Sequence, residues 1–566
     1  MVPPNRHSLR YVSRPALAIA VLLSSCALVL AWWFLRGVEV SLPSVSSPQS
    51  QQIPCVSYSP FRHPDINPFN YLAEVTPAQI RADLALLKTR TDCIRTYGLT
   101  QGLDAVPAVA KELGMRVRLG VWLARDAAQN QAQLMQGLAL AKRYPEVIDL
   151  LIVGNEVLLR KELTAPQLAE ILSQAQALSP VPITYADVWE FWQRHSELAK
   201  HVDLVTVHIL PYWEDKPVAV RDAAKHVQEV GRKMQQFFAG KPVWIGETGW
   251  PAAGRQRDGA VPGRVEQSAF MRDLMLLRPA IAQDFNVIEA FDQPWKRSFE
   301  GAMGGYWGLF DAQGQARVSL SGAVVEDAQW WRGFVGAGLG ALMGVLSAGV
   351  MQRLMRSWSV WGWSVGCIGG GLMGSICAVQ ILMSTWWDRS PFEQAVSLAL
   401  GSLGAASAAL SLSQLVFAHH RRLIEPAQKT VERWVARAAD AARLGVLFCA
   451  ATAALVLLLD PRYRPFPWWW FLAPTASWLA LRCGAPQRLA NISQQTQFLA
   501  CALAVFAVAL VIQEGWRNVQ ALTYGLLLLS LAAVAALPAL ATFPALPALA
   551  KTKAASKAAG APSSVE

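Results

Sequence analysis

The distribution of apolar residues constrains this fold most, because the chain beyond Trp330 is apolar almost to its end. Of the 566 residues, 16% are charged and 53% are hydrophobic, whereas a soluble domain carries about 25% charged residues. A helix that crosses a bilayer needs about 20 apolar residues, and stretches of that length recur here. We therefore predict an all-α membrane domain over 330–545, with seven spans at about 333–351, 359–384, 394–418, 443–459, 466–482, 496–512 and 521–544.

A further apolar stretch, from Pro15 to Leu35, follows the basic sequence RHSLRYVSR. It is longer than the apolar core of a secretory signal, which has about 7–15 residues. Residues 1–36 are therefore expected to be a cytoplasmic segment followed by an uncleaved transmembrane anchor. The span at 466–482 is the weakest of the eight, because it is short and contains two prolines.

Lys and Arg gather in alternate connections between the spans and in the tail at 546–566, which is expected to be a disordered cytoplasmic segment. The positive-inside rule assigns this side to the cytoplasm. Eight spans then place both termini inside and the domain between the anchor and the bundle outside. We interpret the net charge of +11 as part of this topology signal and predict no nucleic-acid partner.

After a Ser/Pro/Gln-rich linker at 37–52, residues 53–314 have the composition of a soluble α/β domain. Segments with helical periodicity separate eight short apolar runs, and this alternation is typical of parallel βα units. Eight such units over about 260 residues predict a (β/α)8 TIM barrel. An open doubly wound sheet is the alternative, but the glycine-rich fingerprint of that fold is missing. The eight runs are 55–59, 93–98, 116–123, 148–156, 182–189, 203–210, 242–248 and 286–292.

Two glutamates end apolar runs of the predicted barrel: Glu156 ends the fourth run and Glu247 lies near the end of the seventh. A buried charge in an apolar strand is costly unless it has a partner or a task. In (β/α)8 barrels the catalytic groups gather at the carboxyl ends of the strands. Two carboxyl groups at one barrel mouth fit glycoside hydrolysis, in which one protonates the leaving oxygen and the other attacks the anomeric carbon.

The motifs around these acids resemble glycoside hydrolase family 17. The resemblance rests on VGNEV and WIGETGWP, with YSP, IRTYG and FDQPWK around them, and covers about 53–314. It implies a (β/α)8 barrel, retention of configuration and a β-1,3-glucan donor, with Glu156 as acid/base and Glu247 as nucleophile. The membrane-bound arrangement resembles a bacterial branch that includes glucan transglycosylases, which implies the inner membrane with the catalytic domain in the periplasm. Leu210 departs from the family, which often has an aromatic residue before Pro-Tyr on the sixth strand.

Other polar residues at strand ends are candidate substrate contacts. Asn155 is expected to donate to a sugar hydroxyl, and Arg95 to orient Glu247, although an ordinary structural amide and an ordinary buried ion pair remain the alternatives. Tyr97 and Tyr212 are predicted either to contact the sugar or nucleophile or to pack at the barrel mouth. The remaining candidates on the eighth run and its loop are Glu289, Asp292 and Lys296.

Aromatic residues cluster at or just after the strand ends, where ring faces can pack on sugars. Trp250 and Trp295 lie in the family motifs and are the best candidates among Trp122, Trp189, Trp192, Trp213, Trp250 and Trp295. His208 is interpreted as a structural histidine rather than a catalyst.

Two cysteines, Cys55 and Cys93, begin neighbouring runs of the soluble domain, and the sequence leaves open a disulfide or two free thiols. No CxxC pair or Cys/His cluster indicates a metal site. We therefore predict neither a metal nor a cofactor.

Three classes of function remain. A transglycosylase that extends, branches or cyclises β-1,3-glucan is favoured, because a membrane anchor suits an enzyme acting near a glucan exporter. The alternatives are an endo- or exo-β-1,3-glucanase and a non-catalytic glucan-binding partner of a membrane synthase. The expected partners are β-glucan, membrane lipid and such a synthase or exporter. The chain itself lacks a cytoplasmic segment large enough for a processive synthase, since the longest predicted cytoplasmic connection has about 25 residues.

Overall fold

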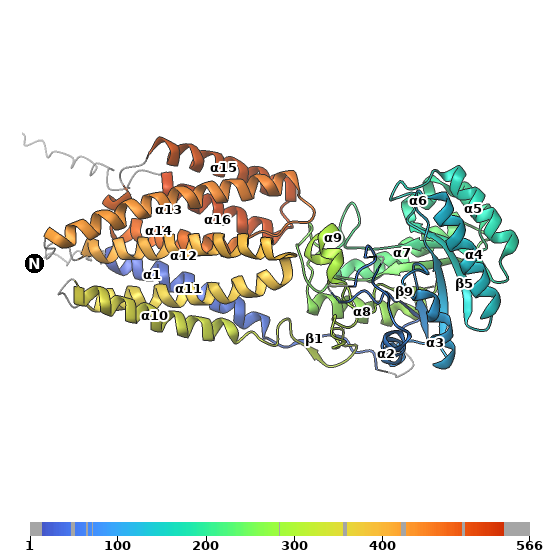
Figure 1. The fold of residues 1–566 in the computed structure, drawn as a ribbon. Helices are drawn as coiled ribbons and strands as arrows, with labels where there is room; N and C mark the ends of the chain where they lie inside the picture. The colour runs from blue at the N-terminus through green and yellow to red at the C-terminus, as the bar shows by residue number, and fades with distance from the viewer. Residues whose placement is uncertain are drawn as a thin grey trace, which may run out of the picture.

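The computed structural model contains two units, a barrel and a helical bundle, joined by two chain crossings (Figure 1). The predicted N-terminal segment before Arg14 and the predicted tail at 546–566 lie outside the described residues. The structure describes residues 14–46, 51–63, 66–70, 72–281, 283–354, 359–419, 426–489 and 493–536, without the side chains of 354 and 426–428.

The barrel consists of parallel strands that pair in chain order and close between the last and the first, which confirms the predicted fold. Each of the predicted runs overlaps one strand. The strands are β2 (Cys55–Ser57), β3 (Cys93–Arg95), β4 (Arg116–Val121), β5 (Ile148–Asn155), β6 (Ile183–Val188), β7 (Val205–His208), β8 (Val243–Thr248) and β9 (Phe285–Val287).

Helices follow most of the strands and cover the barrel from outside. Several begin at a residue that satisfies free backbone N–H groups: Thr76 and Asp126 accept from the first turns of α2 and α4, and Thr164 forms a capping box with Gln167 at α5. These helices are α2 (Pro77–Leu87), α3 (Val106–Glu112), α4 (Ala127–Arg143), α5 (Ala165–Leu178), α6 (Trp189–Arg194), α7 (Val220–Phe237), α8 (Arg264–Leu277) and α9 (Arg297–Gly304).

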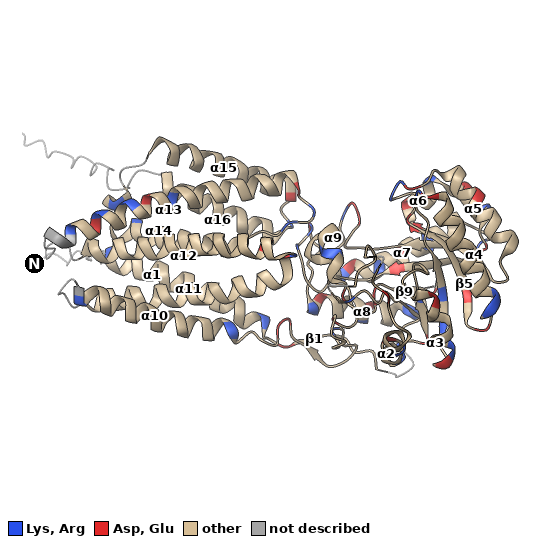
Figure 2. Cartoon of the chain, viewed as in Figure 1, with Lys and Arg blue, Asp and Glu red and all other residues tan. Residues whose placement is uncertain are grey.

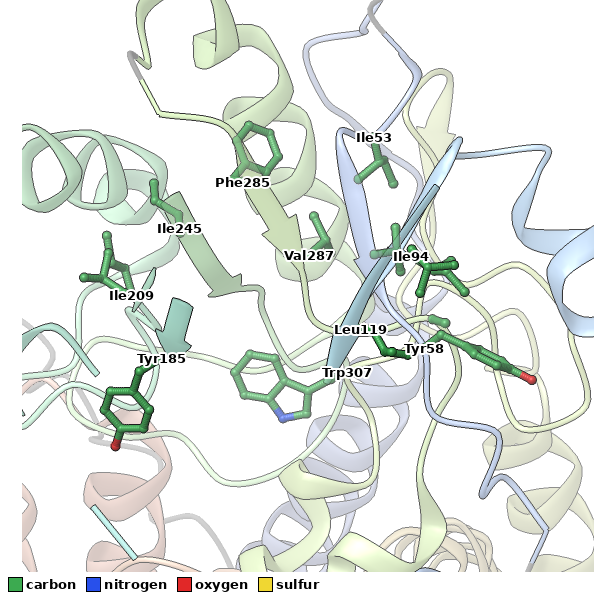
Figure 3. Close-up of a cluster of buried hydrophobic side chains, with 14 of the residues drawn as sticks. Ile53, Tyr58, Ile94, Leu119, Tyr185, Ile209, Ile245, Phe285, Val287 and Trp307 are labelled. Atoms are coloured by element: carbon green, nitrogen blue, oxygen red, sulfur yellow. The ribbon is translucent and has the colours of Figure 1, made fainter. Parts of the chain in front are cut away.

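The strands are apolar because side chains on both of their faces are buried (Figure 3). Ile94 and Ile245 lie in the core that also includes Val287 and Trp307. Parallel strands covered by helices need near-continuous apolar runs, which explains why the runs could be located in the sequence. Polar residues break this pattern at the strand ends, where the candidate site lies.

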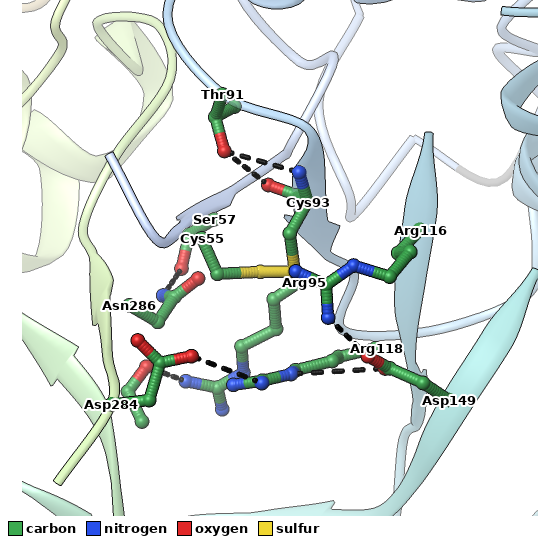
Figure 4. Close-up of a disulfide and its surroundings, with 11 residues drawn as sticks. Cys55, Ser57, Thr91, Cys93, Arg95, Arg116, Arg118, Asp149, Asp284 and Asn286 are labelled. Carbon is green, nitrogen blue, oxygen red and sulfur yellow. Dashed lines mark hydrogen bonds and ion pairs between the residues drawn. A yellow bond between two sulfur atoms is a disulfide. The ribbon is translucent and has the colours of Figure 1, made fainter. Parts of the chain in front are cut away.

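Cys55 and Cys93 form a disulfide between the adjacent strands β2 and β3 (Figure 4). This bond decides between the two alternatives that the sequence left open. The bond closes a loop of 38 residues that contains α2.

Two short strands lie where the chain passes between the units. β1 (Val40–Ser41), within the predicted linker, pairs antiparallel with β10 (Ala323–Val324). Next to this pair, Arg36 forms ion pairs with Glu326 at 3.6 Å and Asp327 at 3.7 Å. The incoming and outgoing chains are therefore tied together just outside the bundle.

The bundle contains a helix at every predicted span. Within the described residues, seven of these helices are long and apolar enough to cross a membrane by length and composition. α14 is the shortest, with 17 residues and Pro474 inside it, and it coincides with the span that the sequence supported least. The helices are α1 (Arg14–Arg36), α10 (Arg332–Leu354), α11 (Val360–Trp387), α12 (Pro391–His419), α13 (Pro426–Leu459), α14 (Trp468–Gly484), α15 (Gln494–Glu514) and α16 (Val519–Ala536).

Glycines bring α10 and α11 into backbone contact. A Cβ added at Gly344 would lie 1.9 Å from the carbonyl oxygen of Gly366. Small residues at such crossings are typical of helix pairs in membranes, where close backbone packing replaces the hydrophobic effect.

α13 differs from the prediction, because it begins at Pro426 rather than near 443. The sequence suggested a connection there, since the segment is rich in charge, but charged residues such as Arg433 and Arg437 are good helix formers. Figure 2 shows these charges at the end of the bundle that is far from the barrel, whereas the middle of the bundle is nearly free of charge.

Candidate active site

The carboxyl ends of β5 and β8 place Glu156 and Glu247 on either side of His208, which ends β7. Nδ1 of His208 lies 2.9 Å from Oε1 of Glu156, and Nε2 lies 3.7 Å from Oε1 of Glu247. One donor atom from each of the three side chains lies within 4.8 Å of the other two. The two carboxylates therefore face one gap rather than separate cavities.

Glu156 directly follows β5 in a left-handed backbone conformation, with φ at 50°. Non-glycine residues adopt this conformation rarely, and it is found most often at functional sites. Its N–H donates to the carbonyl oxygen of Ala186 at 2.7 Å, which fixes the turn against β6. The Glu156 side chain is 21% exposed, so one carboxylate of the pair is open to solvent.

Glu247 is more deeply buried, with 6% of its side chain exposed. Its Oε1 accepts from Nη1 of Arg95 at 3.1 Å and from the hydroxyl of Tyr97 at 2.8 Å. Burial raises the pKa of Glu247, but the charges of His208 and Arg95 and the bond from Tyr97 together hold that pKa below its ordinary value. The group is thus held as an oriented carboxylate.

Arg95 is fully buried and connects several parts of the site. Besides Glu247, it donates to the carbonyl oxygen of Gly246 at 2.6 Å and to Oδ1 of Asn155. Arg95 therefore orients both Glu247, the predicted nucleophile, and Asn155, a predicted sugar contact.

Tyr97 lies between Glu247 and Ser57, whose Oγ is 2.8 Å from the tyrosine hydroxyl. Burial and the charge of Glu247 raise the pKa of Tyr97 well above its ordinary value. The hydroxyl therefore stays protonated and donates a hydrogen bond to the carboxylate of Glu247.

Glu289 and Lys296 form an ion pair of 2.8 Å beside this network. Burial raises the pKa of Glu289 to about 7 although Lys296 lowers it. The other carboxylate oxygen, Oε1, is buried and has no hydrogen-bond partner among the described residues. Lys296 is close enough for its charge to lower the pKa of Glu247. Both residues thus lie at the site.

Three candidate residues have their partners in the surrounding loops, and for Tyr212 this is the packing alternative that the sequence left open. Tyr212 is fully buried and donates to the carbonyl oxygen of Arg255 at 2.6 Å. Trp250 is 1% exposed, and its indole N–H donates to the carbonyl oxygen of Val261 at 3.0 Å. Asp292 binds Arg317 at 2.5 Å and holds the loop that follows β9. These side chains support the loops around the mouth rather than line the gap.

Trp295 is half-buried at the rim, where its ring lies 5.6 Å from that of Phe69. Trp122 is 38% exposed, and the guanidinium of Arg160 lies 4.1 Å from the centre of its ring. Both side chains are therefore partly exposed near the mouth.

Sequence reasoning gave two polar groups beside the acids no role in the site. His208 was interpreted as structural, and this stays a prediction; in the structure it contacts both carboxylates. Asp187, at the end of β6, is fully buried, and burial together with the charge of Glu156 raises its pKa to about 7. Both interrupt apolar runs near strand ends, as Glu156 and Glu247 do, and that signal could have identified them.

Within the described residues, Glu156, His208 and Glu247 also form a group that could hold a metal ion by the spacing of their donor atoms. The prediction that the site uses no metal stays a prediction.

Two neighbouring carboxylates at the carboxyl ends of strands in a closed parallel barrel are the arrangement that glycoside hydrolysis requires. Residues 55–308 match the model of the BtgE/BtgC glycoside hydrolase domain.

Two curated relatives illustrate the likeness. A glucan 1,3-beta-glucosidase of Candida albicans is 26% identical over 264 residues, which are 42% of this chain and 84% of the relative. A probable beta-glucosidase btgE of Aspergillus fumigatus is 24% identical over 242 residues, which are 41% of this chain and 42% of that protein.

Solved structures are similar in the barrel. A glycoside hydrolase family 17 beta-1,3-glucanosyltransferase from Rhizomucor miehei is 24% identical, with a TM-score of 0.42, and covers 49% of this chain and 99% of its own. An endo-laminarinase from Formosa is 20% identical, with a TM-score of 0.39, and covers 47% and 85%.

Proposed function

We propose that this chain is a membrane-anchored retaining enzyme that acts on β-1,3-glucan and transfers the cleaved chain to a glucan acceptor. The observation that carries the proposal is the group of Glu156, His208 and Glu247, whose donor atoms lie within 4.8 Å of one another. Retaining glycosidases have carboxyl groups about 5–5.5 Å apart, whereas inverting enzymes need about 6.5–9.5 Å to admit a water molecule.

In the first half-reaction, Glu247 attacks the anomeric carbon while Glu156 protonates the glycosidic oxygen, and the bond to the leaving sugar breaks. The result is a glycosyl ester on Glu247. In the second half-reaction, Glu156 takes the proton of an acceptor hydroxyl, whose oxygen displaces Glu247. The low pKa of Glu247 suits a carboxylate that must attack and then leave.

Asn155 and Glu289 are proposed to bind the sugar hydroxyls next to this bond. Oδ1 of Asn155 is engaged by Arg95, which leaves its amide N–H groups for the sugar. The buried Oε1 of Glu289 lacks a partner, and a sugar hydroxyl would supply one. Arg95 and Lys296 hold these two groups in place.

The substrate class is supported by the curated relatives, which are named as glucan 1,3-beta-glucosidases. Those names favour a hydrolase, which is the second candidate. Transfer is favoured by the attachment of the barrel to a bundle of apolar helices, because an enzyme that only degrades soluble glucan gains nothing from remaining at a membrane.

A laminari-oligosaccharide of one defined length tests the two outcomes with the full-length protein. Transfer predicts products both longer and shorter than the donor, whereas a product set with shorter fragments alone would refute transfer and leave the hydrolase. Glu247→Gln is the control and should abolish both kinds of product.

We also propose that the barrel lies outside the cytoplasm, in the periplasm of a bacterial cell, with both termini inside. Arg221 on α7 and Arg433 on α13 are both exposed and lie in different units. In a variant without free cysteines, a membrane-impermeant maleimide should label Arg221→Cys in cells whose outer membrane is permeabilised. Arg433→Cys should react with the maleimide only after the cells are lysed. Labelling of Arg433→Cys in unlysed cells, with Arg221→Cys labelled only after lysis, would refute this orientation.

A further inference from the structure

The bundle contacts the barrel directly. The connections between bundle helices at the end that faces the barrel, which we call the outer connections, contact the loops that follow β7, β8 and β9. In the loop after β8, Arg255 pairs with Glu514 and donates to the carbonyl oxygen of Arg464 at 3.0 Å. Next to it, Gln256 and Gln520 exchange two hydrogen bonds of 3.0 and 3.2 Å. These loops belong to the carboxyl ends of the strands, where the acids lie.

A second set of contacts joins α9 to the outer ends of α11 and α12. Arg297 and Tyr306 both donate to the carbonyl oxygen of Thr385, at 2.9 and 3.3 Å. Arg389 donates back to the carbonyl oxygen of Ser298 at 3.3 Å. The bundle therefore meets the barrel through several connections, including the segment between α13 and α14, residues 460–467, which contains Arg464.

That segment brings an arginine and a tyrosine to the barrel. The guanidinium of Arg462 lies 5.1 Å from the ring centre of Trp213, and the ring of Tyr463 lies 6.1 Å from that of Trp213. Gly301, at φ 71°, allows this approach, because a Cβ added there would lie 2.3 Å from the carbonyl oxygen of Tyr463. Arg462 is exposed, and Trp213 and Tyr463 are half-buried.

The barrel residues next to Gly301 connect this contact to the catalytic site. Glu300, next to Gly301, is half-buried, and burial raises its pKa. The charge of Lys296 lowers this pKa, those of Glu156 and Glu247 raise it, and that of Arg462 lowers it. Glu300 lies on the stretch of chain that runs from Lys296, which pairs with Glu289 at the site, to Gly301, which approaches Tyr463 of the bundle.

We propose that Arg462 and Tyr463 of the bundle, with Trp213 and Glu300 of the barrel, form a subsite for a glucan chain that extends beyond the catalytic pair. This inference rests on the proposed function. We call these four residues the bundle-side subsite.

The chemistry of the four residues suits a sugar. The rings of Trp213 and Tyr463 meet nearly edge to face, at 65°, and sugar C–H groups pack on such rings. Arg462 offers donors for ring hydroxyls, and Glu300 offers acceptors. Two of the four residues come from the bundle, so the barrel alone would lack half of this subsite.

The test measures kcat/KM of the full-length protein for laminari-oligosaccharides of increasing length. Arg462→Ala/Tyr463→Ala should lower kcat/KM about five- to tenfold for the longest substrates, the effect of losing about one stacked ring and its polar contacts. The same variant should cleave the shortest substrate at the wild-type rate, because that substrate does not reach the bundle.

Trp516→Ala/Arg517→Ala is the matched control. It removes an aromatic and an arginine that stack on each other in another outer connection, between α15 and α16, and both side chains are exposed. The control should show the wild-type dependence on length.

Three results would overturn the subsite. They are an unchanged length profile in Arg462→Ala/Tyr463→Ala, an equal loss for every length, or the same change in the control. An equal loss together with a lower melting temperature would identify Arg462 and Tyr463 as a clamp between the units. A wild-type protein that cleaves no β-1,3-glucan would instead refute the proposed function itself.

Discussion

Arg95→Met tests the electrostatic account of the site, because Arg95 is the fully buried cation that donates to Glu247. Methionine keeps much of the side-chain length and removes the charge. A hydrogen bond to a charged group contributes about 1.5–3 kcal/mol, and about 1.4 kcal/mol corresponds to one pKa unit. The pKa of Glu247 should therefore rise by about one to two.

The sign of the pH effect follows from the proposed role of Glu247 as an ionised nucleophile. Activity is lost as the pH falls through its pKa, so a raised pKa moves the acidic limb of kcat/KM to higher pH. The lowered pKa of Glu247 also stabilises the fold above the pKa of the unfolded chain, and this contribution disappears as the pH falls. Breaking the buried pair should cost about 3–5 kcal/mol of folding free energy.

The assay is the pH profile of kcat/KM on a laminari-oligosaccharide, recorded next to a thermal unfolding curve. Arg118→Met is the matched control, since Arg118 on β4 is also largely buried and pairs with Asp149 and Asp284. It should lower stability without moving the acidic limb. An acidic limb that stays in place in Arg95→Met would refute the view that this charge holds Glu247 ionised.

Two further predictions concern the acid/base residue and the disulfide. Glu156→Gln should lower the cleavage of unactivated glucan about 10²–10⁴-fold, the usual contribution of general acid catalysis. It should form the glycosyl-enzyme almost normally from a substrate with a good leaving group, and an equal loss on both substrates in steady-state and burst kinetics would contradict the role. Cys55→Ser/Cys93→Ser should lower the free energy of unfolding by about 2–5 kcal/mol while kcat at low temperature stays unchanged. A melting temperature equal to that of the reduced wild-type protein is expected, and one equal to that of the oxidised protein would refute a stabilising bond.

The barrel could be predicted because parallel strands buried on both faces have to be apolar, and each of the runs became one strand. Glu156 and Glu247 were predicted as the catalytic acids for the same reason, since each acid interrupts such a run, and this stays a prediction. The bundle helices were equally visible through their length. The start of α13 was missed because surface charge marks the end of a membrane span but does not end a helix.

The roles of single aromatic residues were less predictable. Tyr212 and Trp250 have the same types and near-strand positions as Tyr97 and Trp295, yet they point into the core. Which way a loop residue faces depends on contacts that are distant in sequence, such as the bond from Tyr212 to Arg255. The contact of Trp213 with residues 462 and 463 is a stronger example, because nearly 250 residues separate the partners.

The most direct test of the double-displacement mechanism is to trap the covalent intermediate. The full-length protein is incubated with a 2-deoxy-2-fluoro-β-glucosyl donor that carries a good leaving group, digested, and mapped by mass spectrometry. The mechanism predicts one fluoroglucosyl group per chain, attached to Glu247 and lost when an acceptor sugar is added. A label on another residue, or rapid turnover that releases the α-anomer without a label, would contradict it.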